Sequence, residues 1–531
     1  MMRIPKWSCC SHLPFISVCA LTLLLSTGCS TLPPGSNLHK AQSYALNPAE
    51  KTHLGDQVAQ VSNAHAGNSG FRIITAGEDA FLIRVQMINA AERTLDLQYY
   101  IFRGDETGRL ITDALLKAAD RGVRIRVLVD DGDTVKGDEQ ILALGTHAHI
   151  EIRIFNPFAY RGHLLAFRAA EFLFSHSRLD YRMHNKLMVV DNAVALVGGR
   201  NIGNQYFQVD PKSQFADDDV FAAGPIGALL SAKFDEYWNS RWAIPVAERQ
   251  ASAGRGNRAH QMQWPTGNSS NYVEKIVSGE PYGALISGGL PLVFAPARVI
   301  CDSPDKREVQ EGVRSGYLMS QAILESAMQV QSELLIVTPY FIPAPDELAL
   351  VTDLRKRNVH VGIVTNSLES TVDILAQAAY SIYRKPLLRE GVEIHEIRAL
   401  LGNTHGSGQT KRISRYGNFG LHAKLFVFDR KKVFFGSMNY DQRSRHLNTE
   451  IGLIIDSVEL AQQTGTRFAA MAQPANAYTP RVQEGVGHRF NIVWHTEEHG
   501  MPVEYSKEPS RSAWKRAQMK LLSRLPVDKE L

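Results

Sequence analysis

Cysteine is scarce in this chain, and its distribution excludes a disulfide-stabilised fold. The 531 residues contain five cysteines, of which Cys9, Cys10, Cys19 and Cys29 all lie near the N-terminus. Cys301 is therefore alone in the remainder of the chain, and no intrachain disulfide framework is available there. We expect Cys301 to be a buried and inert thiol.

A strong charge of one sign is also missing. Lys+Arg total 58 and Asp+Glu total 54, which leaves a net charge of +4. That surplus is too small to indicate a nucleic-acid partner, and none is favoured. The chain also lacks the biased composition of disordered, collagen-like or multi-span membrane proteins, since 44% of its residues are hydrophobic and 21% are charged. Its length favours more than one hydrophobic core.

The first residues have the pattern of an export signal. Arg3 and Lys6 precede the largely apolar run Phe15–Leu25, and small residues lead to Cys29. The run is short for a bilayer span, which needs about 20 apolar residues. Small residues before a cysteine resemble the lipobox of bacterial lipoproteins, although Ser26 stands where Leu is usual. We expect a signal peptide over residues 1–28, lipidation at Cys29 and a flexible tether over residues 29–69. An uncleaved signal anchor is the alternative, and sorting to the inner or outer membrane stays open.

The rest of the chain repeats one plan. A strand-like run, a helix-like run and a second strand-like run follow one another twice, which is typical of a parallel crossover unit. We therefore expect two α/β domains with mixed sheets flanked by helices, at residues 70–255 and 272–500, with the boundary in residues 251–271 and a basic segment at 501–531. The runs are Leu95–Phe102, Thr112–Arg121 and Val123–Val129 in the first half, and Glu333–Ile342, Asp346–Arg357 and Val359–Thr365 in the second.

Each half also carries the motif His-x-Lys-x-x-x-x-Asp, followed by Gly-x-x-Asn and then by an acid. In an extended strand, residues two apart point to the same side, so each histidine and its lysine project together. Two such motifs in register are much stronger evidence than one. The residues are His184, Lys186, Asp191, Asn201 and Asp219 in the first half, and His422, Lys424, Asp429, Asn439 and Glu450 in the second.

This residue set suits an anionic oxygen centre and does not suit a metal. Zinc requires several His, Cys or carboxylate ligands around one point, and the lysine ammonium beside each histidine is not a ligand. Lysines and asparagines can instead donate to phosphate oxygens, while two histidines supply a nucleophile and a general acid. The expected site uses no metal and no cofactor.

The two motifs resemble those of the phospholipase D superfamily. The resemblance extends from about Phe71 to the end of the chain. The resemblance implies two tandem phospholipase D-like domains, related by a pseudo-two-fold axis around one shared active site. It implies that His184 is the nucleophile that forms a phosphohistidine and that His422 is the general acid; the reverse order of the two histidines is the alternative. It also implies that phosphoryl oxygens are held by Lys186, Lys424, Asn201 and Asn439. Asp219 and Glu450 would support the histidines, and Ser437 would donate a hydroxyl in the second half only. Asp191 and Asp429 would be structural.

Longer segments resemble the type-C branch of the bacterial cardiolipin synthases. They include DLQYYIF at residues 96–102, RMHNK at 182–186 and RSRHLNTE at 443–450. The resemblance implies phosphatidyl transfer to phosphatidylglycerol, with phosphatidylethanolamine or a second phosphatidylglycerol as donor. The expected export signal would place the protein at a membrane, facing the periplasm. The resemblance also implies a small macrodomain-type accessory protein. A secreted phospholipase or nuclease with the same intermediate is the alternative, and a non-catalytic membrane-tethered scaffold is a remote one.

The C-terminal stretch Ser512–Leu525 mixes apolar and basic residues. Trp514, Met519 and Leu521 alternate with Lys515 and Lys520. The pattern fits an interfacial amphipathic helix, and it equally fits a helix packed on the domain with a solvated basic face.

Overall fold

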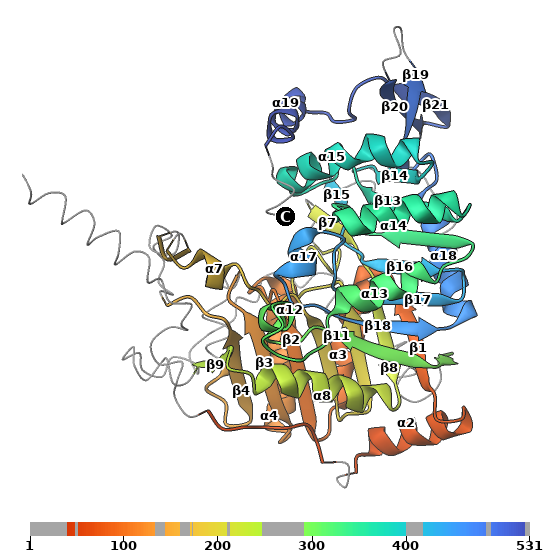
Figure 1. Ribbon diagram of the computed structural model, residues 1–531. Coiled ribbons are helices and arrows are strands. Elements are labelled where there is room, and N and C mark those ends of the chain that lie inside the picture. The colour runs from red at the N-terminus through yellow and green to blue at the C-terminus, as the bar shows by residue number, and fades with distance from the viewer. Residues whose placement is uncertain are drawn as a thin grey trace, which may run out of the picture.

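The computed structural model describes residues 40–47, 51–132, 144–159, 170–172, 174–209, 213–246, 291–399, 418–484 and 490–525. The expected signal peptide, Cys29 and the 251–271 boundary lie outside these residues. Two large sheets dominate, one formed by each half of the chain (Figure 1). Within the described part of the chain, no helix has both the length and the apolar character needed to cross a bilayer.

The first sheet has nine strands, and its middle is a parallel unit. Strands β2, β3 and β4 are parallel, as the crossover pattern predicts, and β5–β6 is the antiparallel hairpin that contains the first motif. In spatial order the strands are β10 (Val293–Ala295), β1 (Ser69–Ile74), β8 (Asp219–Ala223), β6 (Val194–Gly198), β5 (Lys186–Val190), β2 (Thr94–Tyr99), β3 (Arg124–Asp130), β4 (Ile150–Phe155) and β9 (Ala243–Pro245). The helices of this half are α2 (His53–Ala64), α3 (Gly77–Ala90), α4 (Glu106–Asp120), α7 (His176–Leu179) and α8 (Ile226–Trp238).

The second sheet repeats this order, which confirms the duplicated α/β fold. Strands β18, β17, β16, β12, β13 and β14 correspond to β8, β6, β5, β2, β3 and β4. In spatial order the strands are β11 (Ala297–Cys301), β18 (Ile451–Asp456), β17 (Lys432–Gly436), β16 (Leu425–Phe428), β12 (Glu333–Val337), β13 (His360–Asn366), β14 (Glu393–Ile397), β19 (Ala477–Glu484), β20 (Phe490–Glu498) and β21 (Met501–Tyr505). The helices are α12 (Lys306–Gln310), α13 (Met319–Met328), α14 (Pro345–Lys356), α15 (Ile374–Arg389), α17 (Gln442–His446), α18 (Val458–Met471) and α19 (Ala513–Leu522).

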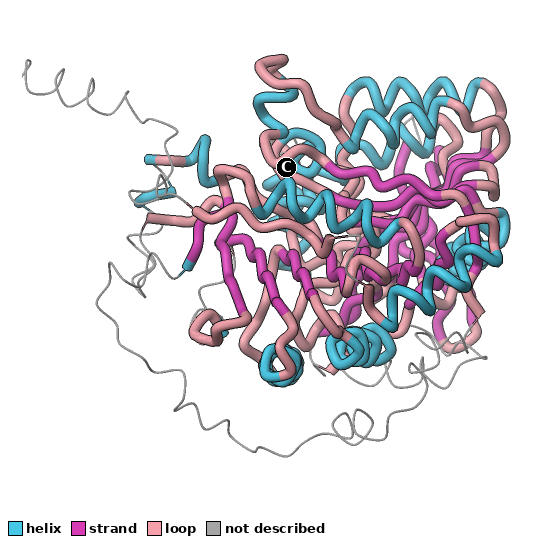
Figure 2. The backbone as a smooth tube through the Cα atoms, turned by 90° about the horizontal axis from the view of Figure 1, so that it is seen from below, coloured by secondary structure: helices cyan, strands magenta, loops and turns pink. Residues whose placement is uncertain are grey.

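The two sheets share one core. The alternating residues Leu187 and Val189 of β5, and Leu425 and Val427 of β16, belong to the same buried cluster, as do the apolar residues of α8 and α18. In Figure 2 the strands gather toward the middle of the molecule and helices lie along the outside. A small parallel sheet also joins the halves, because β7 (Ser213–Ala216) pairs with β15 (Asn418–Leu421). Burial of this common face fixes the two motif edges relative to each other.

Three expected boundaries differ from the structure. Residues 29–69 are not tether throughout, because Thr52 caps α2 and the segment from Lys40 lies against the first half, where Arg126 Nη1 donates to Ser43 O at 2.8 Å. The chain changes sheet at residues 295–297, later than residue 272, because β10 pairs with β1. At the C-terminus β21 extends the second sheet beyond residue 500. These segments are short and lie outside the repeated motifs, so the sequence alone did not indicate them.

Candidate active site

Each motif histidine lies just before a central strand and is held by backbone from the opposite half. The His184 N–H donates to Thr449 O at 2.9 Å, and the His422 N–H donates to Ala216 O at 2.8 Å. Lys186 begins β5 and Leu425 begins β16, so the same short segment precedes both hairpins. The residue after each of these carbonyls is an acid, which is therefore delivered to a histidine that belongs to the other half.

The two histidines form crossed pairs with these acids. His184 Nδ1 lies 3.0 Å from Glu450 Oε2, and His422 Nδ1 lies 2.6 Å from Asp217 Oδ2. Both acids are fully buried. A proton on each Nδ1 directed to the carboxylate leaves Nε2 as the reactive nitrogen, which is the orientation that a carboxylate enforces in a Ser-His-Asp triad.

The supporting role expected of Asp219 is wrong. Asp219 Oδ2 instead lies 3.0 Å from Arg84 Nη1 and 3.2 Å from Arg200 Nη1, in a buried ion cluster beneath the site. Asp217 follows β7, and β7 pairs with the strand that leads to His422, so its carboxylate reaches that histidine. Three consecutive aspartates do not reveal which one does so. The signal that the sequence lacked is the pairing of β7 with β15 across the halves.

The two lysines lie beside the histidines in the same buried space. Lys186 Nζ donates to His184 O at 2.6 Å, and Lys424 Nζ donates to His422 O. Lys186 Nζ also lies 5.4 Å from the centre of the Tyr100 ring. Burial lowers the pKa of Lys186 well below its ordinary value and lowers the pKa of Lys424 to about 8. An anionic partner would therefore stabilise the charged form of each lysine.

The electrostatics connect the two motifs. Burial, reinforced by Lys186 and Lys424, lowers the pKa of His184 well below its ordinary value. Burial and Lys424 lower the pKa of His422 to about 3, against the opposing effect of Asp217. Lysines of both motifs thus act on His184, in keeping with the crossed contacts that bring the two motif edges together. In the absence of an anion both imidazoles are neutral.

The two acids differ in their charge state. Burial raises the pKa of Glu450 to about 7, with Lys186 and the Ser437 hydroxyl opposing it. Burial acts in the same direction on Asp217, but His422, Lys424 and Arg200 outweigh it and hold its pKa well below the usual range. A firmly ionised Asp217 stabilises an imidazolium at His422 more strongly than Glu450 does at His184. The half-sites are therefore alike in geometry and unlike in proton affinity.

The three residues expected to contact substrate have different surroundings. Asn439 lines the cavity beside His184, and its Oδ1 has no hydrogen-bond partner within the described residues. Asn201 is engaged within the protein, since its Oδ1 accepts from Ile101 N at 3.1 Å and its Nδ2 donates to the Tyr206 hydroxyl at 3.0 Å. The Ser437 hydroxyl donates to Glu450 Oε2. The predicted contact of Ser437 with substrate is therefore wrong. Ser437 is fully buried, and its hydroxyl positions Glu450.

The motif aspartates lie at the far end of the hairpins, away from the histidines. Asp191 Oδ1 accepts from Thr94 N at 2.7 Å and from Arg93 N at 2.9 Å. Asp429 Oδ1 accepts from Ser332 N at 2.7 Å. Each carboxylate thus fastens the chain just before or at the start of β2 or β12, and each aspartate adopts a positive φ in the hairpin turn. This geometry makes both residues structural.

Gly198 and Gly199 leave room for the acids. A Cβ at Gly199 would lie 2.1 Å from Asp217 Oδ1, and a Cβ at Gly198 would lie 2.2 Å from Asp219 Oδ1. Neither φ is positive. The pair is therefore needed for close approach of two buried carboxylates, which explains the departure from Gly-Ser in the first half.

An open cavity of about 160 Å³ adjoins His184. Its wall is rich in hydrogen-bond acceptors, and Asn439 Oδ1 and Asn448 Oδ1 are both buried without a partner among the described residues. Burial raises the pKa of Asp441 to about 6. The lining residues are Tyr100, His184, Tyr340, Ile342, Asp373, Ala376, Asn439, Asp441, Arg443 and Asn448.

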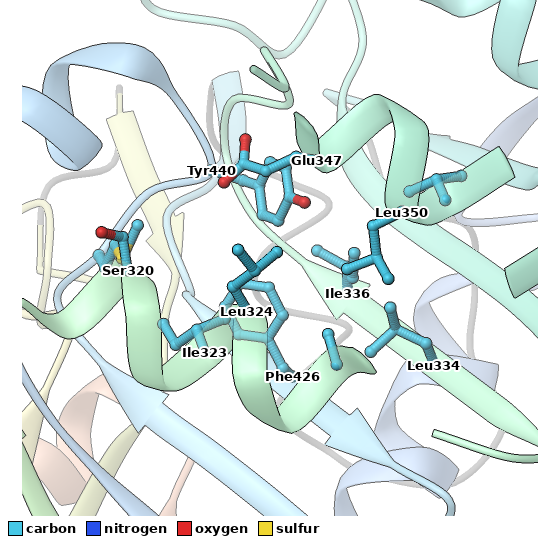
Figure 3. A pocket seen from close by; sticks show the side chains of 12 residues that line it. Ser320, Ile323, Leu324, Leu334, Ile336, Glu347, Leu350, Phe426 and Tyr440 are labelled. Atoms are coloured by element: carbon cyan, nitrogen blue, oxygen red, sulfur yellow. The ribbon is translucent and has the colours of Figure 1, made fainter. Parts of the chain in front are cut away.

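A second, apolar pocket lies behind this wall, between α13 and α14 (Figure 3). Leu324, Ile336 and Phe426 line it, and Glu347 and Tyr440 lie at one end. Its free volume of about 20 Å³ holds little more than one water molecule. It is a packing gap and not a substrate site.

Two histidines, each with its own lysine and with a carboxylate from the opposite half, define a duplicated phosphoryl-transfer site. The family model described as "Cardiolipin synthase, PLD-like domain" matches residues 85–238 and 323–472, and the chain belongs to this family.

Cardiolipin synthase C of Escherichia coli (strain K12) is 36% identical over 485 residues, which cover 90% of this chain and 99% of that protein. The major cardiolipin synthase ClsA of Bacillus subtilis (strain 168) is 25% identical over 414 residues, 77% of this chain and 70% of that protein. The crystal structure of phosphatidylserine synthase from Haemophilus influenzae Rd KW20 is 14% identical, with a TM-score of 0.50, and covers 78% of this chain and 90% of that chain. This last similarity shows a shared fold.

Proposed function

We propose that the protein is a metal-independent phosphatidyltransferase that forms cardiolipin. The observation that carries the proposal is the crossed arrangement in which His184 pairs with Glu450 and His422 pairs with Asp217, with a lysine beside each histidine. Membership of the cardiolipin synthase family supports the choice of lipid substrates.

In the first step, Nε2 of His184 attacks the phosphorus of a phospholipid donor. A P–N bond forms, the P–O bond to the head-group alcohol breaks, and His422 Nε2 gives its proton to the departing oxygen. Lys186 and Lys424 lower the pKa of the histidines by their positive charge. The negative charge of the bound diester offsets this, so His422 gains its proton as substrate binds. Ionised Asp217 favours His422 for this acid role, and His184, beside the weaker acid Glu450, remains the neutral nucleophile.

In the second step, the alcohol of an acceptor lipid replaces the head group that left. His422 takes the hydroxyl proton, the oxygen attacks phosphorus, and the P–N bond to His184 breaks. Phosphatidylglycerol as acceptor gives cardiolipin, with phosphatidylethanolamine or a second phosphatidylglycerol as donor. Water in place of the alcohol would give phosphatidic acid, so exclusion of water from the cavity decides the product.

The acceptor-rich cavity supports a hydroxyl-bearing head group. Asn439 Oδ1, Asn448 Oδ1 and the carboxylates of Asp373 and Asp441 all accept hydrogen bonds, and a glycerol head group offers hydroxyl donors to them. A buried acceptor without a donor is costly, so a substrate that satisfies these atoms is preferred over one that does not.

We propose that the protein, as a member of this family, works at a bacterial membrane. Export with lipidation at Cys29 would hold it there on the periplasmic side, and an accessory macrodomain-type protein is a further expected partner. The N-terminal sequence pattern supports the first inference, and the resemblance to the type-C branch supports the second.

Lipid analysis tests the function. Purified protein is incubated with vesicles of phosphatidylglycerol and phosphatidylethanolamine, and the products are resolved by mass spectrometry, with His184→Ala as the control. Cardiolipin in the wild-type sample alone is the expected result. Phosphatidic acid without cardiolipin would identify a hydrolase, and cleavage of nucleic acid alone would refute lipid transfer.

A further inference from the structure

Helix α19 packs on the second half through only one of its faces. Met519 is buried and belongs to a small cluster with Leu368 and Ala378, against which Ile374 and Leu522 also pack. Ile374 and Ala378 are on α15, whose N-terminal end borders the catalytic cavity through Ala376. The packed-helix interpretation of the C-terminal stretch therefore accounts for this face.

The opposite face of α19 is apolar and exposed. Trp514 and Leu521 are seven residues apart, so they lie on the same side of the helix, and that side is opposite Met519. Their exposed fractions are 70% and 64%, and Leu525, just beyond the helix, is 51% exposed. A helix that needed only to pack on the protein would have polar residues here.

Two further exposed apolar residues lie at the start of α15, the helix on which α19 packs. Val372 and Leu375 are 64% and 42% exposed, and they flank Asp373, which lines the catalytic cavity. We call Trp514, Leu521, Leu525, Val372 and Leu375 the docking patch. Figure 1 shows α19 beside α15 at one end of the molecule, far from α2 and α8. The patch therefore lies next to the cavity and not at a remote surface.

The charges on the α19 side of the patch are of one sign. The segment from Arg511 to Leu525 contains five basic residues and no acid, since its sequence is RSAWKRAQMKLLSRL. Lys520 and Arg524 are exposed beside the apolar residues. An apolar strip with a tryptophan and flanking cations fits the interface of an anionic bilayer, where the cations contact the head groups.

We propose that the docking patch binds the surface of an anionic phospholipid bilayer and so sets the catalytic cavity against its lipid substrates. The choice of a bilayer over a protein partner rests on the proposed function and on this charge pattern. Trp514 and Leu521 enter the boundary between head groups and acyl chains, and Asp373 and Ala376 face the lipids that are drawn into the site.

Quenching of tryptophan fluorescence tests the docking. The full-length protein is bound to vesicles of phosphatidylglycerol and phosphatidylcholine, with part of the phosphatidylcholine brominated on its acyl chains. The difference between wild type and Trp514→Phe isolates the signal of Trp514 from the other tryptophans. We expect Trp514 to be quenched, and Leu521→Ser to weaken docking on the order of tenfold, because one large aliphatic side chain is lost from the apolar phase.

Leu229→Ser is the matched control, because Leu229 on α8 is 53% exposed and lies in the first half. It should leave the quenching of Trp514 unchanged. Equal quenching of wild type and Trp514→Phe would overturn the proposal and leave a protein partner for the patch. Activity is measured in parallel on the same lipids in detergent micelles, where Leu521→Ser should match wild type. Absence of cardiolipin in micelles with normal quenching would refute the proposed function and not the docking.

Discussion

The carboxylate of Glu450 lies 3.0 Å from Nδ1 of His184, although 266 residues separate the two in the chain. The reciprocal pair, His422 and Asp217, is 205 residues apart. Each half of the duplication therefore supplies the histidine of one pair and the acid of the other. A half alone would contain a histidine without its carboxylate, so the chemistry requires both.

The two aspartates near His422 should respond differently to removal of charge. Asp217→Asn keeps the size of the side chain but removes the anion that stabilises an imidazolium at His422. We expect kcat to fall on the order of 10²–10⁴-fold, as for the orienting carboxylate of a catalytic triad. Thermal unfolding should change little by comparison. Steady-state kinetics and a melting curve measure both.

Asp219→Asn is the contrasting variant. It leaves Arg84 and Arg200 buried without their carboxylate, which costs about 3–5 kcal/mol of unfolding free energy. The activity per folded molecule should remain within a few-fold of wild type. If Asp219→Asn removed catalysis from a stably folded protein while Asp217→Asn did not, the assignment of these two residues would be reversed.

The pH dependence should show an alkaline limit set by Lys424. Its ammonium, whose pKa is lowered to about 8, is charged below that pH and loses its proton above it. Since the charged form binds the diester, kcat/KM should fall as the pH rises through about 8. Lys424→Arg keeps its charge at high pH, so any remaining activity should fall less steeply above pH 8, with Lys186 as the remaining titrating ammonium. A wild-type profile that stays flat to pH 10 would contradict the role of the ammonium.

The motif aspartates should affect stability and not chemistry. Asp191→Ala removes a buried carboxylate and leaves the buried N–H of Thr94, with the partly buried N–H groups of Glu92 and Arg93, without this acceptor, so we expect a loss of about 2 kcal/mol or more. Asp429→Ala should cost less, because Gln331 and Ser332 are exposed and water can replace the carboxylate. Denaturant unfolding gives both values. A larger effect at Asp429 would refute this explanation.

The acidic wall of the cavity should select the acceptor alcohol. Asp441→Asn preserves the cap on Ser444 N, since asparagine also caps helices well, but it removes a charged acceptor from the cavity. We expect the KM for phosphatidylglycerol to rise about tenfold, as for loss of a hydrogen bond to a charged group. Release of p-nitrophenol from an activated phosphatidyl ester should be unaffected. An unchanged KM would remove Asp441 from acceptor recognition.

The sequence predicts the fold and the catalytic groups because the pattern of each occurs twice in the chain. His184, Lys186, His422 and Lys424 have fixed spacings, and the alternation of Val123–Val129 and its counterpart specifies parallel strands. Glu450 could also be predicted, since it stands alone before a strand-like run. Cys301, expected to be inert, is buried, and burial raises its pKa well above the ordinary value.

What the sequence does not specify are contacts made between the halves. Asp217 is distinguished from Asp219 only by the pairing of β7 with β15, a contact that no local pattern reveals. Within the second half, a pairing of distant strands has the same effect on Ser437, whose hydroxyl is directed to Glu450 by the pairing of β17 with β18. Helix α2 is amphipathic, with Leu54 buried and Val58 packed against the first core, but its few apolar residues stand among many polar ones and its docking completes it.

Trapping of the covalent intermediate tests the central claim most directly. His422→Ala lacks the acid, so an activated phosphatidyl ester whose leaving group needs no proton is supplied, and the protein is analysed by mass spectrometry. The account predicts a phosphatidyl adduct on His184 in this variant and no adduct in His184→Ala. An adduct on another residue, or labelling that persists in His184→Ala, would contradict a shared site in which His184 attacks.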